Sequence, residues 1–190
     1  MKRIEQPWIL SGYTLFAKEG PKGLTVEGLA RRVGKSKSSF YHHFADLEIF
    51  TELLLDYHLG QISGIAEQER QCRNVVPDLV NLLLTIKENL LFDRQLRIHR
   101  SIPAFKQCFD RSTGEVGNAI SDIFADMLGL THNSNLARMV LTLSLENFYL
   151  QLTDETFTYD WLVGYMNELK AMVSAFLANN QQQSLLYGSV

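Results

Sequence analysis

The sequence predicts an all-α fold, and three observations carry that prediction. Apolar side chains recur every three to four residues, as on the buried face of a helix, and no long stretch alternates as a strand does. The chain holds only 4 prolines, the residue that interrupts helices most strongly. Hydrophobic residues make up 46% of its 190 residues, which is normal for a packed protein of one large or two small domains.

A first helix is expected over about residues 4–18, where four residues at helical spacing form an inner face: Ile9, Tyr13, Phe16 and Ala17. Glycines and a proline then end it and form a loop: Gly20, Pro21 and Gly23.

Residues 25–44 are typical of two short helices joined by a tight turn. Thr25 is expected to cap the first helix, since its hydroxyl can accept a hydrogen bond from an amide one turn inside. Gly34 stands where the chain must reverse, because glycine adopts positive φ without a steric penalty. Ser36 then caps a second helix that runs from about Lys37 to Phe44. The first of these two short helices is expected to bury three apolar residues: Leu29, Ala30 and Val33.

The second short helix has two unlike faces. Phe40 and Phe44 are four residues apart and point inward, while polar and basic side chains lie on the opposite side. A helix-turn-helix presents such a face to the DNA major groove, where donors meet bases and phosphates. The candidate DNA contacts are Thr25, Lys35, Ser36, Lys37, Ser38, Ser39, Tyr41 and His42.

The distribution of charge favours the same interpretation. The whole chain carries −3, but residues 1–45 hold eight basic and three acidic residues, which is +5 and leaves −8 for the remainder. A basic head on an acidic body is the electrostatic pattern of a nucleic-acid-binding protein.

Residues 34–44, Gly-Lys-Ser-Lys-Ser-Ser-Phe-Tyr-His-His-Phe, resemble the recognition-helix motif of the tetracycline-repressor (TetR) family of bacterial regulators. Residues 15–20 resemble the end of that family's first helix, and the likeness covers roughly residues 5–55. Two positions depart from the family pattern. Lys35 replaces a small apolar residue at the turn, and Leu47 stands where a lysine often contacts phosphate.

The rest of the chain is expected to form a helical body. A long helix over about residues 46–72, capped by Asp46, should link the head to this body as a lever. Further helices are expected at about 77–92, 93–100, 103–127, 134–152 and 159–177, followed by a frayed polar tail over 181–190. This organisation divides the chain into a DNA-binding domain, 1–46, and a ligand-binding and dimerisation domain, 47–190.

The last two helices carry more apolar surface than a simple monomer needs. The resemblance implies that they build a four-helix interface in a homodimer, although plain core packing is the alternative. The candidate interface residues are Leu143, Trp161, Tyr165, Leu169, Met172 and Phe176.

The resemblance also implies an effector cavity in the body, for which the abundance of phenylalanine favours a hydrophobic small molecule. The alternative is that the polar candidates satisfy buried backbone groups or a dimer contact. The candidates are His99, Phe105, Phe109, Phe124, Glu146, Asn147 and Tyr149.

Other kinds of chemistry find no support. The chain shows no P-loop, dinucleotide fingerprint, metal-ligand spacing or nucleophile motif, so we expect no enzyme activity, cofactor or metal. Cys72 and Cys108 are read as free thiols of a reducing cytoplasm. No apolar run reaches the roughly 20 residues of a membrane helix.

The sequence therefore predicts a cytoplasmic homodimeric regulator, most simply a ligand-responsive repressor of a palindromic operator in double-stranded DNA. The alternative is a helical interaction or small-molecule carrier protein whose helix-turn-helix is structural.

Overall fold

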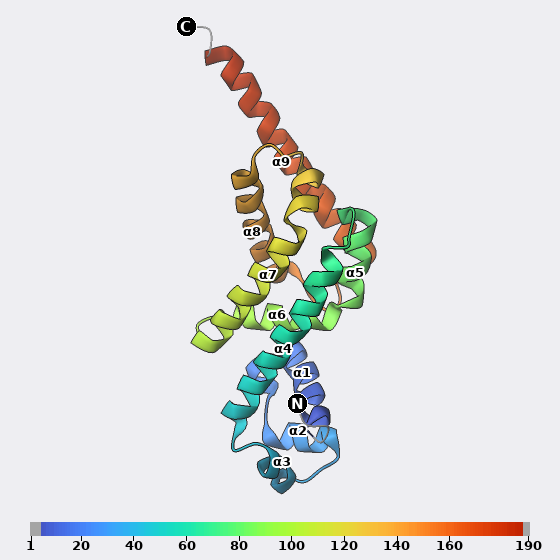
Figure 1. Ribbon diagram of the computed structural model, residues 1–190, viewed down its shortest axis with the longest axis vertical. Coiled ribbons are helices and arrows are strands. Elements are labelled where there is room, and N and C mark those ends of the chain that lie inside the picture. Colours follow the sequence, from blue (N-terminus) through green and yellow to red (C-terminus); the bar gives the residue numbers. More distant parts are fainter. Residues whose placement is uncertain (1–4, 188–190) are drawn as a thin grey trace.

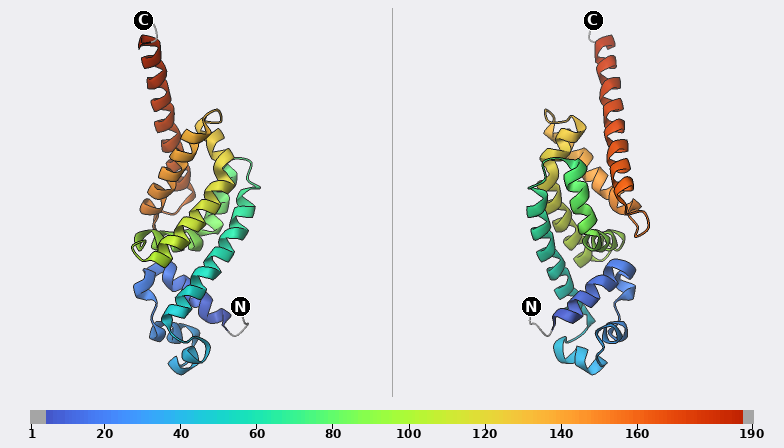
Figure 2. Two further views of the ribbon diagram at one scale, coloured as in Figure 1. Left: turned by 60° about the vertical axis from the view of Figure 1, so that its left-hand side comes forward. Right: turned by 90° about the vertical axis from the view of Figure 1, so that its right-hand side faces the viewer.

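The computed structural model describes residues 5–187, and within them every regular element is helical, as predicted. The molecule is elongated, with a small head at one end and a larger body above it (Figure 1). The last helix projects beyond the body at the opposite end, as both views of Figure 2 also show.

The head consists of α1 (Gln6–Glu19), the short η1 (Gly20–Gly23), α2 (Val26–Val33) and α3 (Lys37–His43). The predicted local signals are confirmed. Thr25 Oγ1 accepts from the Gly28 amide at 3.0 Å, and Ser36 Oγ accepts from the Ser39 amide at 3.2 Å. Gly34 adopts φ 70° and ψ 34°, the left-handed conformation that ends α2.

The long helix α4 (Leu47–Glu69) leaves the head and runs up one side of the body (Figure 1). Asp46 caps it, since its Oδ1 accepts from the Ile49 amide at 2.8 Å. Its first turns belong to the head core, where Phe50 is fully buried. Gly12 of α1 allows this approach, because a Cβ there would lie only 2.6 Å from Cζ of Phe50. The predicted long helix is thus present, although it ends at Glu69 rather than near residue 72.

The body is formed by η2 (Val75–Leu79), α5 (Val80–Thr85), α6 (Lys87–Ile98), α7 (Pro103–Leu128), α8 (Ser134–Gln151) and α9 (Tyr159–Tyr187). Helix α7 packs between α4 and α8, and α6 packs against α1 of the head (Figure 2). Gly129 ends α7 with φ 69°, as expected. No helix among the described residues is long and apolar enough to cross a membrane.

Two predicted boundaries are wrong. A single helix over 77–92 and a short one over 93–100 were expected, but the chain breaks at Ile86, with φ −104° and ψ 22°. Thr85 Oγ1 donates to the Leu82 carbonyl at 2.7 Å at this break, and the new helix α6 turns toward α1. The second error is the polar tail, because helix α9 continues through residue 187. Residues 188–190 of that tail lie outside the described part.

Candidate functional site

The outer surface of the head is formed by α3 and the turn before it. Six of the predicted DNA contacts are exposed there or at the start of α2, and Tyr41 is 57% exposed. Ser39 is half-buried, and its amide donates to the cap residue Ser36. The six exposed candidates besides Tyr41 are Thr25, Lys35, Ser36, Lys37, Ser38 and His42.

The opposite side of α3 is anchored in the head core. Phe40 is fully buried and its ring meets Trp8 edge-on at 5.5 Å, while Phe44 packs against Phe40 at 5.0 Å. Because α3 has only seven residues, this aromatic anchor rather than helix propensity holds its outer face in place. The outer face lies at the free end of the molecule (Figure 1).

Lys37 is already engaged by a carboxylate. Its Nζ donates to Glu27 Oε1 at 2.8 Å, which joins α3 to α2. This contact raises the pKa of Lys37 and lowers the pKa of Glu27, chiefly through the hydrogen bond between them. Both side chains are well exposed, so the pair is weak and can be displaced by a phosphate. This pair could not be predicted from the sequence, because Lys37 and Glu27 are ten residues apart and lie on different helices.

A buried chain of hydrogen bonds crosses from the head into the body. The Tyr13 hydroxyl of α1 lies 2.7 Å from His58 Nδ1 on α4, and His58 Nε2 lies 3.0 Å from Asp93 Oδ1 on α6. Ser112 of α7 also donates to Asp93 Oδ1. Asn89 Nδ2 donates to the Tyr13 oxygen at 2.9 Å. Four helices, α1, α4, α6 and α7, thus meet through one connected polar group.

The hydrogen bonds that link Tyr13, His58 and Asp93 can all form at once, because each donor faces an acceptor. Since the Tyr13 oxygen accepts from Asn89, its proton is free for His58 Nδ1. His58 Nε2–H then donates to the Asp93 carboxylate. Phe92 covers the group, stacking on Tyr13 and on His58 with both pairs of ring centroids 4.4 Å apart. Burial and the Asp93 carboxylate raise the pKa of Tyr13, so the phenol keeps its proton.

Sequence reasoning missed this group, although a signal was present. On α4 the buried stripe runs through Leu54, Ile62 and Ile65, and His58 and Glu69 occupy positions of the same stripe. Ser112 occupies a core position of α7 in the same way, between Phe109 and Val116. A polar residue at a core position of an amphipathic helix must find a partner, and that expectation could have identified it.

Glu69, at the end of α4, is 1% exposed, and its Oε2 has no hydrogen-bond partner among the described residues. Burial, and then the neighbouring Asp93 carboxylate, raise the pKa of Glu69 to about 7. Glu69 lines a small internal cavity of about 40 Å³, together with Tyr149 and apolar residues of the body. Burial and the Asp93 and Glu69 carboxylates raise the pKa of Tyr149.

None of the described cavities brings together the seven predicted effector contacts. Phe105 is buried against Phe16 of the head, with ring centroids 5.3 Å apart. His99 packs closely against Gly20 of the head, since a Cβ on Gly20 would lie 3.0 Å from His99 Nε2. Phe124 is buried in the body core. The physical reason is that α6 packs on the head, which draws its end and the start of α7 to the junction.

The remaining four predicted effector contacts divide among three places. Phe109 and Glu146 line an open cleft of about 880 Å³ between α7 and α8, and Tyr149 lines the small internal cavity. Asn147 faces the outer groove between α8 and α9, where its Oδ1 accepts from Gln151. Glu146 is paired with Arg97 and lies 3.5 Å from Arg100, so it joins α8 to α6.

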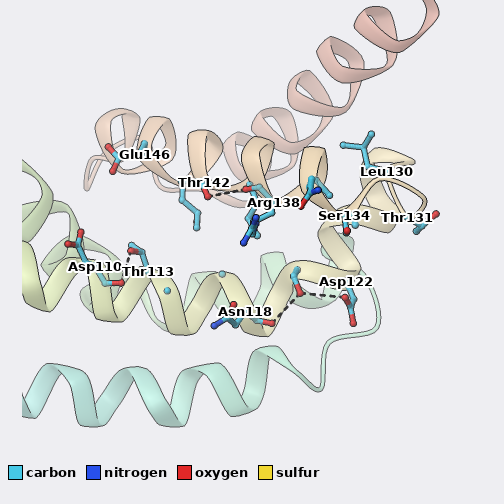
Figure 3. Close-up of a pocket in the computed structure, with 18 of the residues that line it drawn as sticks. Asp110, Thr113, Asn118, Asp122, Leu130, Thr131, Ser134, Arg138, Thr142 and Glu146 are labelled. Carbon is cyan, nitrogen blue, oxygen red and sulfur yellow. Dashed lines mark hydrogen bonds between the residues drawn. The ribbon is translucent and has the colours of Figure 1, made fainter. Parts of the chain in front are cut away.

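The α7–α8 cleft has several polar side chains in its wall. Asp110, Asn118, Asp122 and Arg138 line it, and Arg138 on α8 points toward α7 (Figure 3). It lies open at the surface rather than within the core. No group of three or more potential metal ligands occurs among the described residues. Both cysteines are free, as expected.

The predicted dimer residues lie on one outer face, made by α8 and α9. Leu143, Met172 and Phe176 are 68%, 63% and 56% exposed, although all are large and apolar. They line a groove of about 550 Å³ together with Leu169 and Tyr165. The Tyr165 hydroxyl donates to the Ser144 carbonyl at 2.7 Å, which ties the two helices together. Trp161 lies deeper, stacked on Tyr165.

Comparison with known proteins agrees with this architecture. The family model for bacterial regulatory proteins of the tetR family matches residues 10–48, which span α2 and α3. A search of curated proteins found no match.

Two solved structures share the fold over nearly the whole chain. One is a Rhodococcus sp. protein assigned as a TetR-family transcriptional regulator, with TM-score 0.58 and 19% identity over 92% of this chain and 98% of that one. The other, assigned likewise, is from Mesorhizobium loti MAFF303099, with TM-score 0.53 and 19% identity over 93% and 96%. The N-terminal domain therefore matches the family model of the tetR-type regulatory proteins, and the chain as a whole shares the fold of these two proteins.

Proposed function

We propose that this protein is a TetR-family transcriptional regulator, namely a ligand-responsive repressor that acts as a homodimer on a palindromic operator. In this proposal residues 1–46 form the DNA-binding domain, and residues 47–190 form the ligand-binding and dimerisation domain. The chain performs no catalysis, and it works in the cytoplasm, where bacterial DNA lies.

The observation that carries the proposal is the exposed face of α3, held outward by buried Phe40 and Phe44 at the tip of a basic head. Lys37 and Ser38 lie in its first turn, where a recognition helix contacts base edges. Tyr41 and His42 lie beside them and are suited to phosphates. The cap residues Thr25 and Ser36 use only their oxygens as acceptors, so their hydroxyl protons remain available to phosphates.

The exposed apolar face of α8 and α9 supports the homodimer. Large apolar side chains gathered in one groove mark an association site on a soluble protein. Two heads of one dimer must then reach major grooves about 34–36 Å apart, or a multiple of this. A palindromic operator follows from the twofold symmetry of such a dimer.

The route for an effector signal is supported by the helices that touch α1. Helices α4 and α6 both pack on α1, and the Tyr13–His58–Asp93 chain joins all three. An effector that binds the body better in the DNA-free form shifts the balance between the two forms and weakens operator binding by the same factor. At a hundredfold excess over Kd it stabilises its form by about 2.7 kcal/mol.

The test is to mix the full-length protein with fragmented genomic DNA, recover the bound fragments and sequence them. We expect enrichment of a few sites with inverted repeats, and loss of that enrichment in Lys37→Ala. Recovery of DNA without any shared sequence, or no recovery, would contradict the proposed operator.

A further inference from the structure

We propose that the interior of the body binds a hydrophobic amine, whose cationic nitrogen is held by Glu69. This inference rests on the proposed ligand-responsive function and specifies the chemical class of its effector.

The first observation is a buried carboxylate that lacks a partner. Glu69 is 1% exposed, lines the internal cavity, and leaves its Oε2 without a hydrogen bond in the described part of the chain. An unpartnered carboxylate in an apolar interior is costly, and a protein retains one where something pairs with it. An ammonium or N–H donor is the complementary group.

The second observation is the sign of the surrounding charge. Asp93 lies close enough to affect the ionisation of Glu69, and Asp93 Oδ2 also has no hydrogen-bond partner within residues 5–187. Glu69 is the last residue of the 23-residue helix α4, whose carbonyl end adds negative potential. None of the twelve described residues that line the cavity is basic. The site therefore disfavours an anion and favours a cation.

The third observation is the wall around the carboxylate. Leu79, Leu83, Leu90, Val116 and Met166 line the cavity, so the remainder of the ligand has to be apolar. A sugar or a nucleotide would leave its polar groups unpaired against these side chains.

The fourth observation concerns entry. The cavity of about 40 Å³ holds little more than a water molecule, so a larger ligand needs one wall to move. The wall formed by η2 and α5 is suited to this. Non-helical Val76 and the break at Ile86 flank it, and α5 has only six residues. It contributes Leu79 and Leu83 to the cavity.

The experiment compares two probes of the same shape at pH 8, 4-phenylbutylamine and 4-phenylbutan-1-ol, by titration calorimetry on the full chain. In the wild type we expect the amine to bind at least about tenfold more tightly than the alcohol. Glu69→Gln should abolish that preference. The matched control is Glu67→Gln on the same helix, whose side chain is 67% exposed, and it should keep the preference.

A second variant is designed to make room for the probes without any movement of the cavity wall. Leu83→Ala enlarges the cavity, so both probes should bind it more tightly than they bind the wild type, with the amine still preferred. Equal binding of amine and alcohol, an amine preference that survives Glu69→Gln, or no binding even to Leu83→Ala would overturn the inference.

Failure of this inference is distinguishable from failure of the proposed function. Binding of the enriched operator, measured on the same preparations without amine, reports on the repressor alone. Operator binding together with no amine preference rejects the amine site and leaves the regulator in place. An amine preference together with no operator binding supports the site and counts against the repressor.

Discussion

The hydroxyl of Tyr13 on α1 lies 2.7 Å from Nδ1 of His58 on α4, and His58 in turn contacts Asp93 on α6. The helix that supports the proposed DNA-binding surface is thus hydrogen-bonded to the interior of the body. Movement of α4 or α6 has to shift α1 or break this contact.

The first prediction concerns that contact. Tyr13→Phe should lower the free energy of unfolding by about 1–3 kcal/mol, because His58 and Asn89 each lose a buried partner. It should also weaken the link between effector and operator. Tyr57→Phe is the matched control, since Tyr57 packs edge-on against Tyr13 but is only partly buried. Urea denaturation followed by circular dichroism measures the free energy of unfolding of both variants. Equal losses of stability in the two variants would contradict the special role of Tyr13.

The second prediction concerns the Lys37–Glu27 pair. Lys37→Ala should weaken operator binding by about 1–3 kcal/mol per half-site if Lys37 reads a guanine. Glu27→Gln should strengthen binding, because a carboxylate no longer competes with DNA for the ammonium. Glu67→Gln, which removes the same charge far from α3, is the control. Fluorescence anisotropy with labelled operator gives the affinities, and tighter binding by Glu67→Gln alone would contradict the competition.

The third prediction concerns Tyr41, which is exposed at the surface of α3 although its ring meets that of Phe40 edge-on at 5.5 Å. Tyr41→Phe removes a phosphate contact and should weaken specific and non-specific DNA by a similar factor. Competition with mutated operators provides the measurement. A change in which base is preferred would show that Tyr41 reads sequence instead.

The fourth prediction concerns assembly. Met172→Asp or Phe176→Asp places a charge in the apolar α8–α9 groove and should give a monomer of 21.7 kDa by light scattering. Operator affinity should fall with it, because one head contacts only half of the site. Ile102→Asp is the control, since Ile102 is an exposed apolar residue outside this groove. A wild type that is already monomeric at micromolar concentration would contradict the dimer.

The fifth prediction concerns pH. Glu69 has a folded-state pKa of about 7, above its ordinary value of 4.5, so folding favours its protonated form. The stability that Glu69 contributes to the folded state is fully present below pH 4.5 and is lost as the pH rises through about 7. The total loss is roughly 3 kcal/mol at most. Glu69→Gln should therefore gain stability relative to the wild type between pH 5 and pH 8. Denaturation across this range tests it, and a constant difference would reject the raised pKa.

The predictable parts of the fold are those determined by neighbouring residues. Thr25, Ser36 and Asp46 cap the helices that follow them, and Gly34 and Gly129 end those before them, because each effect lies within one turn of chain. The face of α3 was predictable for the same reason. Phe40 and Phe44 are four residues apart, so their burial determines which side chains remain outside.

The missed features depend on contacts between distant segments. The break at Ile86 follows no glycine or proline, and only the packing of α6 on α1 accounts for its new direction. The apolar neighbourhood of Phe105 in the sequence favours an effector cavity, but its ring meets Phe16 of the head. Asp93 and Glu69 carry no local signal, because Asp93 finds its partners on other helices and Glu69 Oε2 has none among the described residues.

The rings at the head–body junction have a consequence for how such a protein can evolve. Phe92 of α6 packs on Tyr13 and Phe16 of α1, and its centroid lies 4.4 Å and 4.3 Å from theirs. Genetic recombination at residue 46 would join α1 to a foreign α6 and leave these rings without matching partners. The first 46 residues and α6 therefore have to change together, and substitutions confined to α3 leave this junction intact.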